Sequence, residues 1–392
     1  MKYIGNGFSS KVNRALYVIP LMVCFLLGSI AFAQDEKTAT EEILDILKEQ
    51  GQISDSQYQE ILEKAEEEEV SGAGLVPYWN EGLGFASPDG RFEVEIGGRI
   101  MVDWATISAD DKFDAEIEEA EGDPLEGDGV EFRRARLFVE GTVYDAVFFK
   151  AQYDFAGGDP EFKDVYMGLK KIPGIGHMKV GHFKEPYSLE EQTSSKYITF
   201  MERSLPVNAF SPGRNTGLMI YNSALDNRMS WAVGSFYDAD DFGNSFNDFS
   251  DINLSARVTG APLFANDGKQ AVHLGLSYSH QFRDADEETE LRYRVRPSAH
   301  ITDARLANTG NILADDADIF GLEAAAVFGP FSAQAEYITS MVHSDAADDP
   351  VFSGYYIYGS YFLTGESRDY KPGSGSFSRD RKSTRLNSSH YS

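Results

Sequence analysis

The sequence predicts an all-β protein in which antiparallel strands form a transmembrane β-barrel, preceded by a short N-terminal α-helical segment. Three observations predict this class: strands that alternate between apolar and polar residues, an N-terminal export signal, and a regular succession of short and long connections. The alternation is clearest over 130–155. Arg134 and Arg136 share one face there, and Leu137 and Val139 share the other. A period of two indicates extended strands, and each arm has about the ten residues that cross a bilayer at a tilt.

One such hairpin fits two folds. In a soluble β-sandwich the apolar face is a core and the polar face meets water. In an outer-membrane barrel the apolar face meets lipid and the polar face lines a lumen. The rest of the chain has to separate these alternatives.

Residues 1–33 predict a cleaved signal peptide. Lys2, Lys11 and Arg14 precede the apolar run 15–30, which ends in the A-x-A cleavage site 31–33. Such a run is too short and ends too abruptly for a membrane anchor. The only cysteine lies inside it, so the mature chain has no disulfide framework. We therefore expect export to the outer membrane of a Gram-negative cell.

Composition supports a strand-rich envelope protein. The 392 residues include 27 Phe and 20 Tyr, and aromatic residues form girdles at both interfaces of outer-membrane barrels. The formal net charge of −28 excludes a nucleic-acid partner. No later apolar run is long enough for a membrane helix.

Two segments precede the expected barrel. Residues 34–70 contain helical signals, with a capping box at Thr38 and Glu41 and an apolar stripe that ends at Gly51. We expect an acidic helical hairpin or short oligomerising coil there, with a solvated acidic spacer as the alternative. Residues 71–90, which contain glycines and prolines, are expected to be a linker.

About twelve strands are expected within a barrel domain spanning 91–380. They are 91–107, the two arms of 130–155, 162–171, 177–184, 216–224, 228–237, 252–260, 270–282, 319–328, 331–342 and 353–363. Short turns and long connections alternate along this series, as in barrels with short periplasmic turns and long external loops. A sandwich requires no such parity, so the series favours the barrel. The same succession of short and long connections predicts that 283–318 is one long external loop, although its RYRVR segment has the pattern of a strand.

Four blocks then resemble a known family. They are RRARLFVEG, VGHFKEPYSLEEQTSSKYITFMERSLPVNAFSPGR, RPSAHITDARLANTGNI and YYIYGSYFLTGESRDYKPGSGSF, in this order. Together they resemble the phosphate-selective porin O and P family. The resemblance implies a trimeric outer-membrane barrel of about sixteen strands that passes phosphate or other anions. It also implies that the third long loop, here 185–213, folds into the lumen and narrows it.

The end of the chain departs from that pattern. Residues 381–392 are polar and rich in serine, without the terminal aromatic strand expected of such barrels. We expect them to be a non-native tail on a fragment, and about twelve of sixteen strands to be present.

An anion channel needs positive charge along its path, and arginine suits phosphate through its fork of donors. Alternation predicts six cations on the lumen face: Arg134, Arg136, Lys150, Lys170, Lys179 and Arg257. Arg203 and Arg214 fall in or beside the expected constriction loop, and Arg292, Arg294 and Arg296 lie on an external arm that could reach inward. The alternative is that lumen charges pair with Glu140, Asp154 and Asp164 and only solvate the wall.

Three functions follow: an anion-selective channel for phosphate or polyphosphate, a general diffusion porin, and a structural envelope protein tethered through its N-terminal helices. Acidic external loops could also hold divalent cations that bridge lipopolysaccharide. No motif of catalysis, cofactor binding or metal ligation is recognised, so no enzyme activity and no cofactor are expected.

Overall fold

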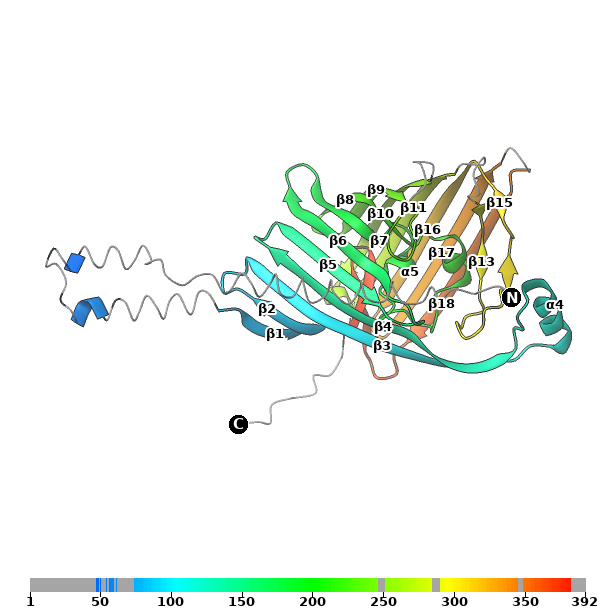
Figure 1. Cartoon of the computed structure of the whole chain (residues 1–392), viewed down its shortest axis with the longest axis horizontal. Coiled ribbons are helices and arrows are strands. Elements are labelled where there is room, and N and C mark those ends of the chain that lie inside the picture. Colours follow the sequence, from blue (N-terminus) through cyan, green and yellow to red (C-terminus); the bar gives the residue numbers. More distant parts are fainter. Residues whose placement is uncertain are drawn as a thin grey trace, which may run out of the picture. The chain divides into compact units, whose positions relative to one another are not determined.

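The computed structural model describes residues 47–48, 50, 54, 56–59, 61, 74–245, 251–283, 290–344 and 348–381 (Figure 1). The chain divides into two compact units, Met1–Gly74 and Leu75–Ser392. In the first unit, residues 47–48, 56–59 and 61 are helical, and the acidic helical hairpin or coil expected over 34–70 stays a prediction. The predicted signal peptide and residues 382–392 of the predicted tail lie outside the described residues.

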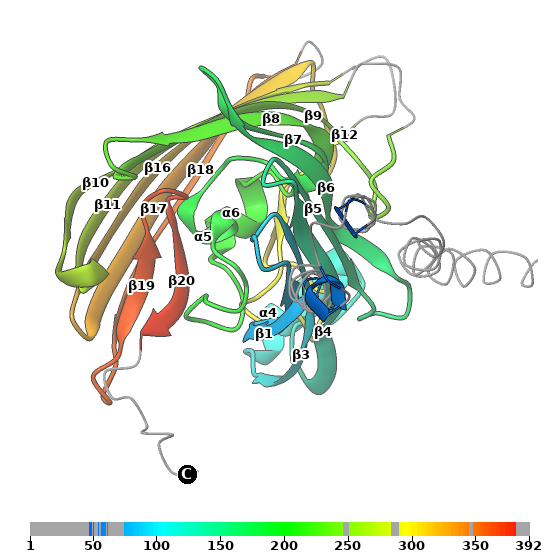
Figure 2. The same ribbon diagram turned by 90° about the vertical axis from the view of Figure 1, so that its left-hand side faces the viewer.

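The second unit is built on one antiparallel sheet of fourteen strands, whose neighbours along the chain are also neighbours in the sheet. The strands are β1 (Val76–Asn80), β2 (Gly82–Ala86), β3 (Phe92–Ile107), β4 (Gly127–Val143), β5 (Val147–Asp154), β6 (Glu161–Ile172), β7 (Gly176–Lys184), β8 (Arg214–Ala224), β9 (Met229–Tyr237), β10 (Ile252–Ala265), β11 (Gln270–Phe282), β16 (Asp316–Phe328), β17 (Phe331–His343) and β18 (Val351–Tyr361). Every expected strand is present, with shifted ends. Figure 2 shows the sheet curling around an interior, with β1 and β18 as its edges. A closed barrel of about sixteen strands stays a prediction.

The prediction of a linker over 71–90 is wrong for most of that range. β1 and β2 form a hairpin there, and β2 pairs with β3. Their alternation is weak in the sequence because glycines occupy positions where larger side chains would show it. Gly84 lies opposite Tyr78, and a Cβ on Gly84 would come within 2.1 Å of the tyrosine ring. The ring therefore covers the glycine, a cross-strand arrangement that stabilises a strand without its own side chain.

The two faces of the sheet rule out the sandwich for the described part of the chain. Apolar side chains on the convex face stay exposed: Ile100 is 73% and Trp104 79% exposed. Polar side chains of the other face are buried, including Arg134 at 3% and Gln334 at 2%. An exposed apolar face with a polar interior is the pattern of a sheet that meets lipid, and no second large sheet packs on it within the described ranges.

The long connections carry short elements of their own. The connection after β3 contains helix α4 (Asp111–Glu121), and 185–213 contains α5 (Leu189–Gln192) and α6 (Leu205–Phe210). A loop outside the main sheet was predicted for 283–318. The described residues of 283–315 do stay out of that sheet, whereas 316–318 belong to β16. The described residues of this connection form two-residue ladders, which pair β12 (Glu290–Leu291) with β15 (Ile312–Leu313) and β13 (Arg294–Val295) with β14 (Ala307–Asn308). The turn after β10 holds η1 (Asn266–Gly268).

A final hairpin pairs β19 (Ser367–Lys371) with β20 (Ser376–Arg381) outside the main sheet. Arg381, expected to begin the tail, is the last residue of β20 and pairs with Ser367. Among the described helices, none has the length and hydropathy needed to span a bilayer.

Candidate functional site

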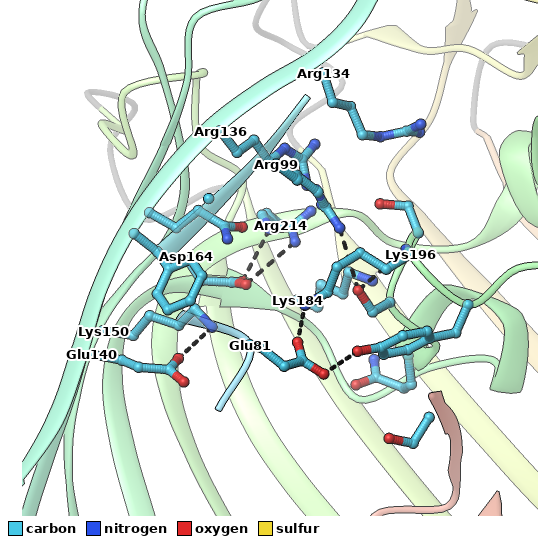
Figure 3. Close-up of a pocket in the computed structure, with 18 of the residues that line it drawn as sticks. Glu81, Arg99, Arg134, Arg136, Glu140, Lys150, Asp164, Lys184, Lys196 and Arg214 are labelled. Atoms are coloured by element: carbon cyan, nitrogen blue, oxygen red, sulfur yellow. Dashed lines mark hydrogen bonds and ion pairs between the residues drawn. The ribbon is translucent and has the colours of Figure 1, made fainter. Parts of the chain in front are cut away.

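A polar cavity of about 520 Å³ lies between the inner face of β3–β8 and the connection 185–213 (Figure 3). Ten cationic side chains and four carboxylates line the cavity. The cations are Arg99, Arg134, Arg136, Lys150, Lys179, Lys184, Lys196, Arg203, Arg214 and Lys371, and the carboxylates are Glu81, Glu95, Glu140 and Asp164. The interior of a protein with net charge −28 therefore contains one strongly cationic site.

A β-bulge directs two consecutive arginines into the interior. Met101 pairs with Arg134 and Val102 with Phe132, so Arg133 is the extra residue of β4. A bulge lets neighbouring side chains escape strict alternation. Phe132 accordingly points outward and is 64% exposed, whereas Arg133 and Arg134 both approach the carboxylate of Glu202 in the constriction loop.

Arg99 stands beside these residues without a carboxylate of its own. It lies directly opposite Arg136 in the register of β3 and β4. Its Nη1 donates to Ser194 Oγ at 3.4 Å, and its enclosed Nε has no hydrogen-bond partner among the described residues. Like charges in opposite positions destabilise a sheet. An anion bound between these arginines would therefore reduce their repulsion and stabilise the site.

Three other cations are neutralised by the carboxylates that the sequence singled out. Arg136 contacts Asp154 at 2.6 Å, and Lys150 contacts Glu140 at 2.5 Å. Arg214 donates to both oxygens of Asp164, at 3.0 and 3.5 Å. The alternative interpretation, that wall charges pair with one another, is therefore correct for these three.

The connection 185–213 lies against the inner face of distant strands, as the resemblance implied. Glu336 of β17 accepts the amides of Leu189 and Glu190, at 3.0 and 2.8 Å, and so caps α5. Glu185 accepts from Asn215 and Asn253, both at 2.7 Å. Burial raises the pKa of the Glu185 carboxyl, although these hydrogen bonds oppose the rise. Figure 2 shows α5 and α6 within the curve of the sheet.

Arg203 and Lys184 hold this loop together rather than facing open space. Arg203 Nε donates to the carbonyl of Glu190 at 3.0 Å, and its Nη2 donates to that of Thr193 at 3.1 Å. Both cations contact the carboxylate of Glu191. Burial alone would raise the pKa of Glu191, but the charges of Arg203 and Lys184 outweigh it and lower that pKa. These carbonyls end the short helix α5, where a cation is favourable.

Lys179 is bound by aromatic faces instead. Its Nζ lies 4.1 Å from the ring centroid of Phe183, 4.9 Å from that of Tyr166 and 5.8 Å from that of Tyr221. A cation over aromatic faces is stabilised without losing its charge to a carboxylate.

The other predicted cations are not brought to the cavity. Lys170 donates to Thr142 at 2.8 Å. Arg257 is buried against Glu323 at 2.7 Å and donates to the carbonyl of Gly375. In the external connection, Arg292 donates to Asn308 and Arg296 to Asp303. Arg294 belongs to the same connection, in β13.

Six of the eleven predicted residues therefore line the cavity, and a role for the other five along an anion path stays a prediction. Alternation along a strand predicts which face of the sheet a side chain is on. It does not predict the position of that side chain along the barrel axis or the residue with which it pairs.

The sequence analysis missed five cations in or beside the cavity, which are Arg99, Arg133, Lys184, Lys196 and Lys371. Arg99 shares the inner-face positions of its predicted strand, so alternation alone could have found it. Lys184 could not be found in this way, because its position in the strand has the opposite parity to that of Lys179. Lys196 lies in the constriction loop and pairs with Glu81. Arg133 could not be found, because its inward direction depends on the bulge.

The exposed apolar face and the charged interior define a membrane-embedded β-protein of the porin class. The family model of phosphate-selective porin O and P matches residues 105–385. The chain belongs to the phosphate-selective porin O and P family, and it is therefore an outer-membrane porin.

Two relatives show how far the likeness extends. Porin O of Pseudomonas aeruginosa is 29% identical over 334 residues, which cover 77% of this chain and 71% of that protein. An uncharacterized protein of Caulobacter vibrioides is 29% identical over 314 residues, 79% of this chain and 60% of that protein.

Among solved structures, a loop L8 deletion mutant of OmpT, an outer membrane protein of Vibrio cholerae, is similar with a TM-score of 0.46. The identity is 14%, and the likeness covers 71% of this chain and 80% of that one. In-vitro folded OmpT gives a TM-score of 0.37 at 12% identity, and the likeness covers 74% of this chain and 93% of that one.

Proposed function

We propose that the chain forms a water-filled channel that conducts anions such as phosphate or polyphosphate, with the cationic cavity as its selective region. The observation that carries the proposal is the group Arg99, Arg134 and Arg136 on neighbouring positions of β3 and β4, next to the Ser194 hydroxyl. Guanidinium forks and a hydroxyl donor match the oxygens of phosphate.

Conduction also requires that the anion leave. The carboxylates of Asp154, Asp164 and Glu202 reduce the field around the arginines. A site with partly neutralised cations attracts an anion without holding it for long, which is the balance that a channel needs.

The three wall ion pairs also favour the general diffusion porin as a second candidate. In that function the cations would only solvate the wall, and the channel would show little preference between small ions. A structural role through the N-terminal helices would give no conductance. The homotrimer and the contacts with lipopolysaccharide stay predictions, and chemical cross-linking of the purified protein tests the trimer.

Planar-bilayer recordings distinguish these functions. In a KCl gradient, the proposed channel gives a reversal potential of the anion-selective sign, and added phosphate reduces the chloride current. Arg99→Ala weakens both effects. Arg296→Ala is the matched control, because it removes the same charge from a side chain paired with Asp303 in the external connection.

A reversal potential near zero that neither variant changes would support general diffusion. A cation-selective potential would overturn the proposal.

A further inference from the structure

A second group of ligand-type side chains lies on the convex face of the sheet, away from the cationic cavity. Asp316 and Asp318 sit on β16, with His280 on β11 and His343 on β17 at their sides. The register places His280 opposite Asp318 and His343 opposite Asp316. Each pair is thus fixed by backbone hydrogen bonding between strands, which positions side chains more rigidly than a loop does.

The distances suit one small ion. Ligand atoms of His280, Asp316 and Asp318 all lie within 4.8 Å of one another. His280 Nδ1 is 2.9 Å from Asp318 Oδ1. His343 Nε2 is 3.7 Å from Asp318 Oδ2 and 3.9 Å from Asp316 Oδ1. Ligand atoms of a tetrahedral zinc site are about 3.4 Å apart, given metal–ligand bonds of about 2.1 Å.

The charges of the group are not balanced by the chain. Within the described ranges, no lysine or arginine forms an ion pair with Asp316 or Asp318, whose ionic contacts are the two histidines. Asp316 Oδ1 is enclosed and has no hydrogen-bond donor among these residues. An enclosed carboxylate oxygen without a donor is costly, and a cation would satisfy it.

Neighbouring side chains orient the ligands from behind. Tyr278 donates its hydroxyl to Asp318 Oδ1 at 2.6 Å, and the His280 ring packs edge-on against Phe282 at 4.2 Å. Asp349 lies 3.7 Å from the other ring nitrogen of His343. Metal-binding histidines usually have such a carboxylate on the nitrogen that does not bind the metal.

We propose that His280, His343, Asp316 and Asp318 form a binding site for a divalent transition metal, with Zn²⁺ as the ion that fits best. Imidazole nitrogen together with carboxylate oxygen is a donor set for zinc, whereas Ca²⁺ and Mg²⁺ prefer oxygen alone. The ion would join three strands at the end from which the connection 283–315 leaves. Along β16 the exposed Phe320 and Leu322 follow the two aspartates on the same face. The site therefore lies at the end of the strand, next to the apolar part of the convex face.

Isothermal titration of ZnCl₂ into the chelator-treated full-length protein in detergent tests the site. We expect one zinc ion per chain, a higher Tm with zinc, and no displacement by a hundredfold excess of Mg²⁺. Asp318→Asn and His343→Gln should each weaken zinc binding at least tenfold.

His300→Gln is the matched control, since His300 contacts the single carboxylate of Glu131, and it should bind zinc as the unmodified protein does. His343 has a side chain 47% exposed, so its substitution leaves folding intact, and circular dichroism verifies this. Zinc binding that is unchanged in both cluster variants, or that magnesium displaces, would overturn the proposal.

Discussion

Arg99 of β3 and Arg136 of β4 occupy directly opposite positions of the antiparallel sheet, on its concave face. Asp154 neutralises Arg136 at 2.6 Å, but within the described ranges Arg99 has no carboxylate in ion-pair contact. The repulsion between the two arginines lowers the stability of the sheet, but it leaves a positive field at the cavity. Five predictions follow from this site and its surroundings.

Replacing Arg99 by methionine should stabilise the fold slightly while weakening anion selectivity. A methionine keeps the length of the side chain and removes the repulsion from Arg136, which is about 0.2–1 kcal/mol for a cross-strand pair of like charges. The reversal potential in a KCl gradient and the midpoint of guanidinium unfolding measure the two effects. Arg296→Met controls for the loss of one charge, and reduced stability without a change in selectivity would contradict the prediction.

Replacing Glu202 by glutamine should shift selectivity in the opposite direction. Burial alone would raise the pKa of the Glu202 carboxyl, but the hydrogen bond from Arg133 and the charges of Arg133 and Arg134 outweigh it and lower that pKa. Glutamine leaves both arginines uncompensated, so the preference for chloride over potassium should rise.

Acidification should reproduce this effect in the unmodified protein. Because the pKa of Glu202 is lowered by folding, its contribution to stability is present above the ordinary carboxyl pKa and is lost as pH falls through the lowered value. Recordings from pH 7 to pH 3 measure the rise in chloride preference. The glutamine variant is the control, and an equally large rise in that variant would assign the titration to another group.

Replacing Asp164 by asparagine should destabilise the wall. Arg214 donates to both Asp164 oxygens, and both side chains are partly buried, at 19% and 23% exposed. Removing one partner leaves a charged group incompletely satisfied, at a cost of about 1–3 kcal/mol. The double variant Asp164→Asn with Arg214→Met should recover most of that loss in a denaturant titration. No recovery would mean that each residue acts through other contacts.

Replacing Glu336 by alanine should loosen the constriction loop. The carboxyl group accepts two amides at the start of α5, and leaving a buried donor without its acceptor costs about 1–3 kcal/mol. Single-channel current should become larger and noisier, because the loop no longer holds one position. Ser332→Ala on the same face of β17, which removes a hydroxyl contact with Ser360, should leave the current unchanged.

The hydrophobic period located the strands because a sheet between lipid and water exposes one face of every strand to each medium. That physical constraint acts on each strand separately, so the twelve expected strands could be predicted. The succession of short and long connections predicted that 283–318 stays outside the main sheet, which holds for its described residues up to 315, because β16 begins at Asp316. The β1–β2 hairpin could not be predicted, because Gly84 has no side chain to show the alternation. The ring of Tyr78 fills the space that a side chain on Gly84 would occupy.

Within the site, alternation predicted the inward faces of Arg134, Arg136 and Lys150, and could have given that of Arg99. It could not predict that Arg257 is occupied by Glu323, because their contact joins residues 66 positions apart on β10 and β16. Nor could it show Arg133, whose direction depends on the bulge opposite Met101 and Val102.

The amino-acid sequence alone was enough to predict the family, twelve of the strands and most of the charged side chains on the inner face, because these depend on local order and on residue type. Only the tertiary structure decided which cations meet around the cavity and which are neutralised. Cross-strand register, the bulge in β4 and the inward fold of 185–213 set those distances, and the strength of an electrostatic interaction depends on distance and burial.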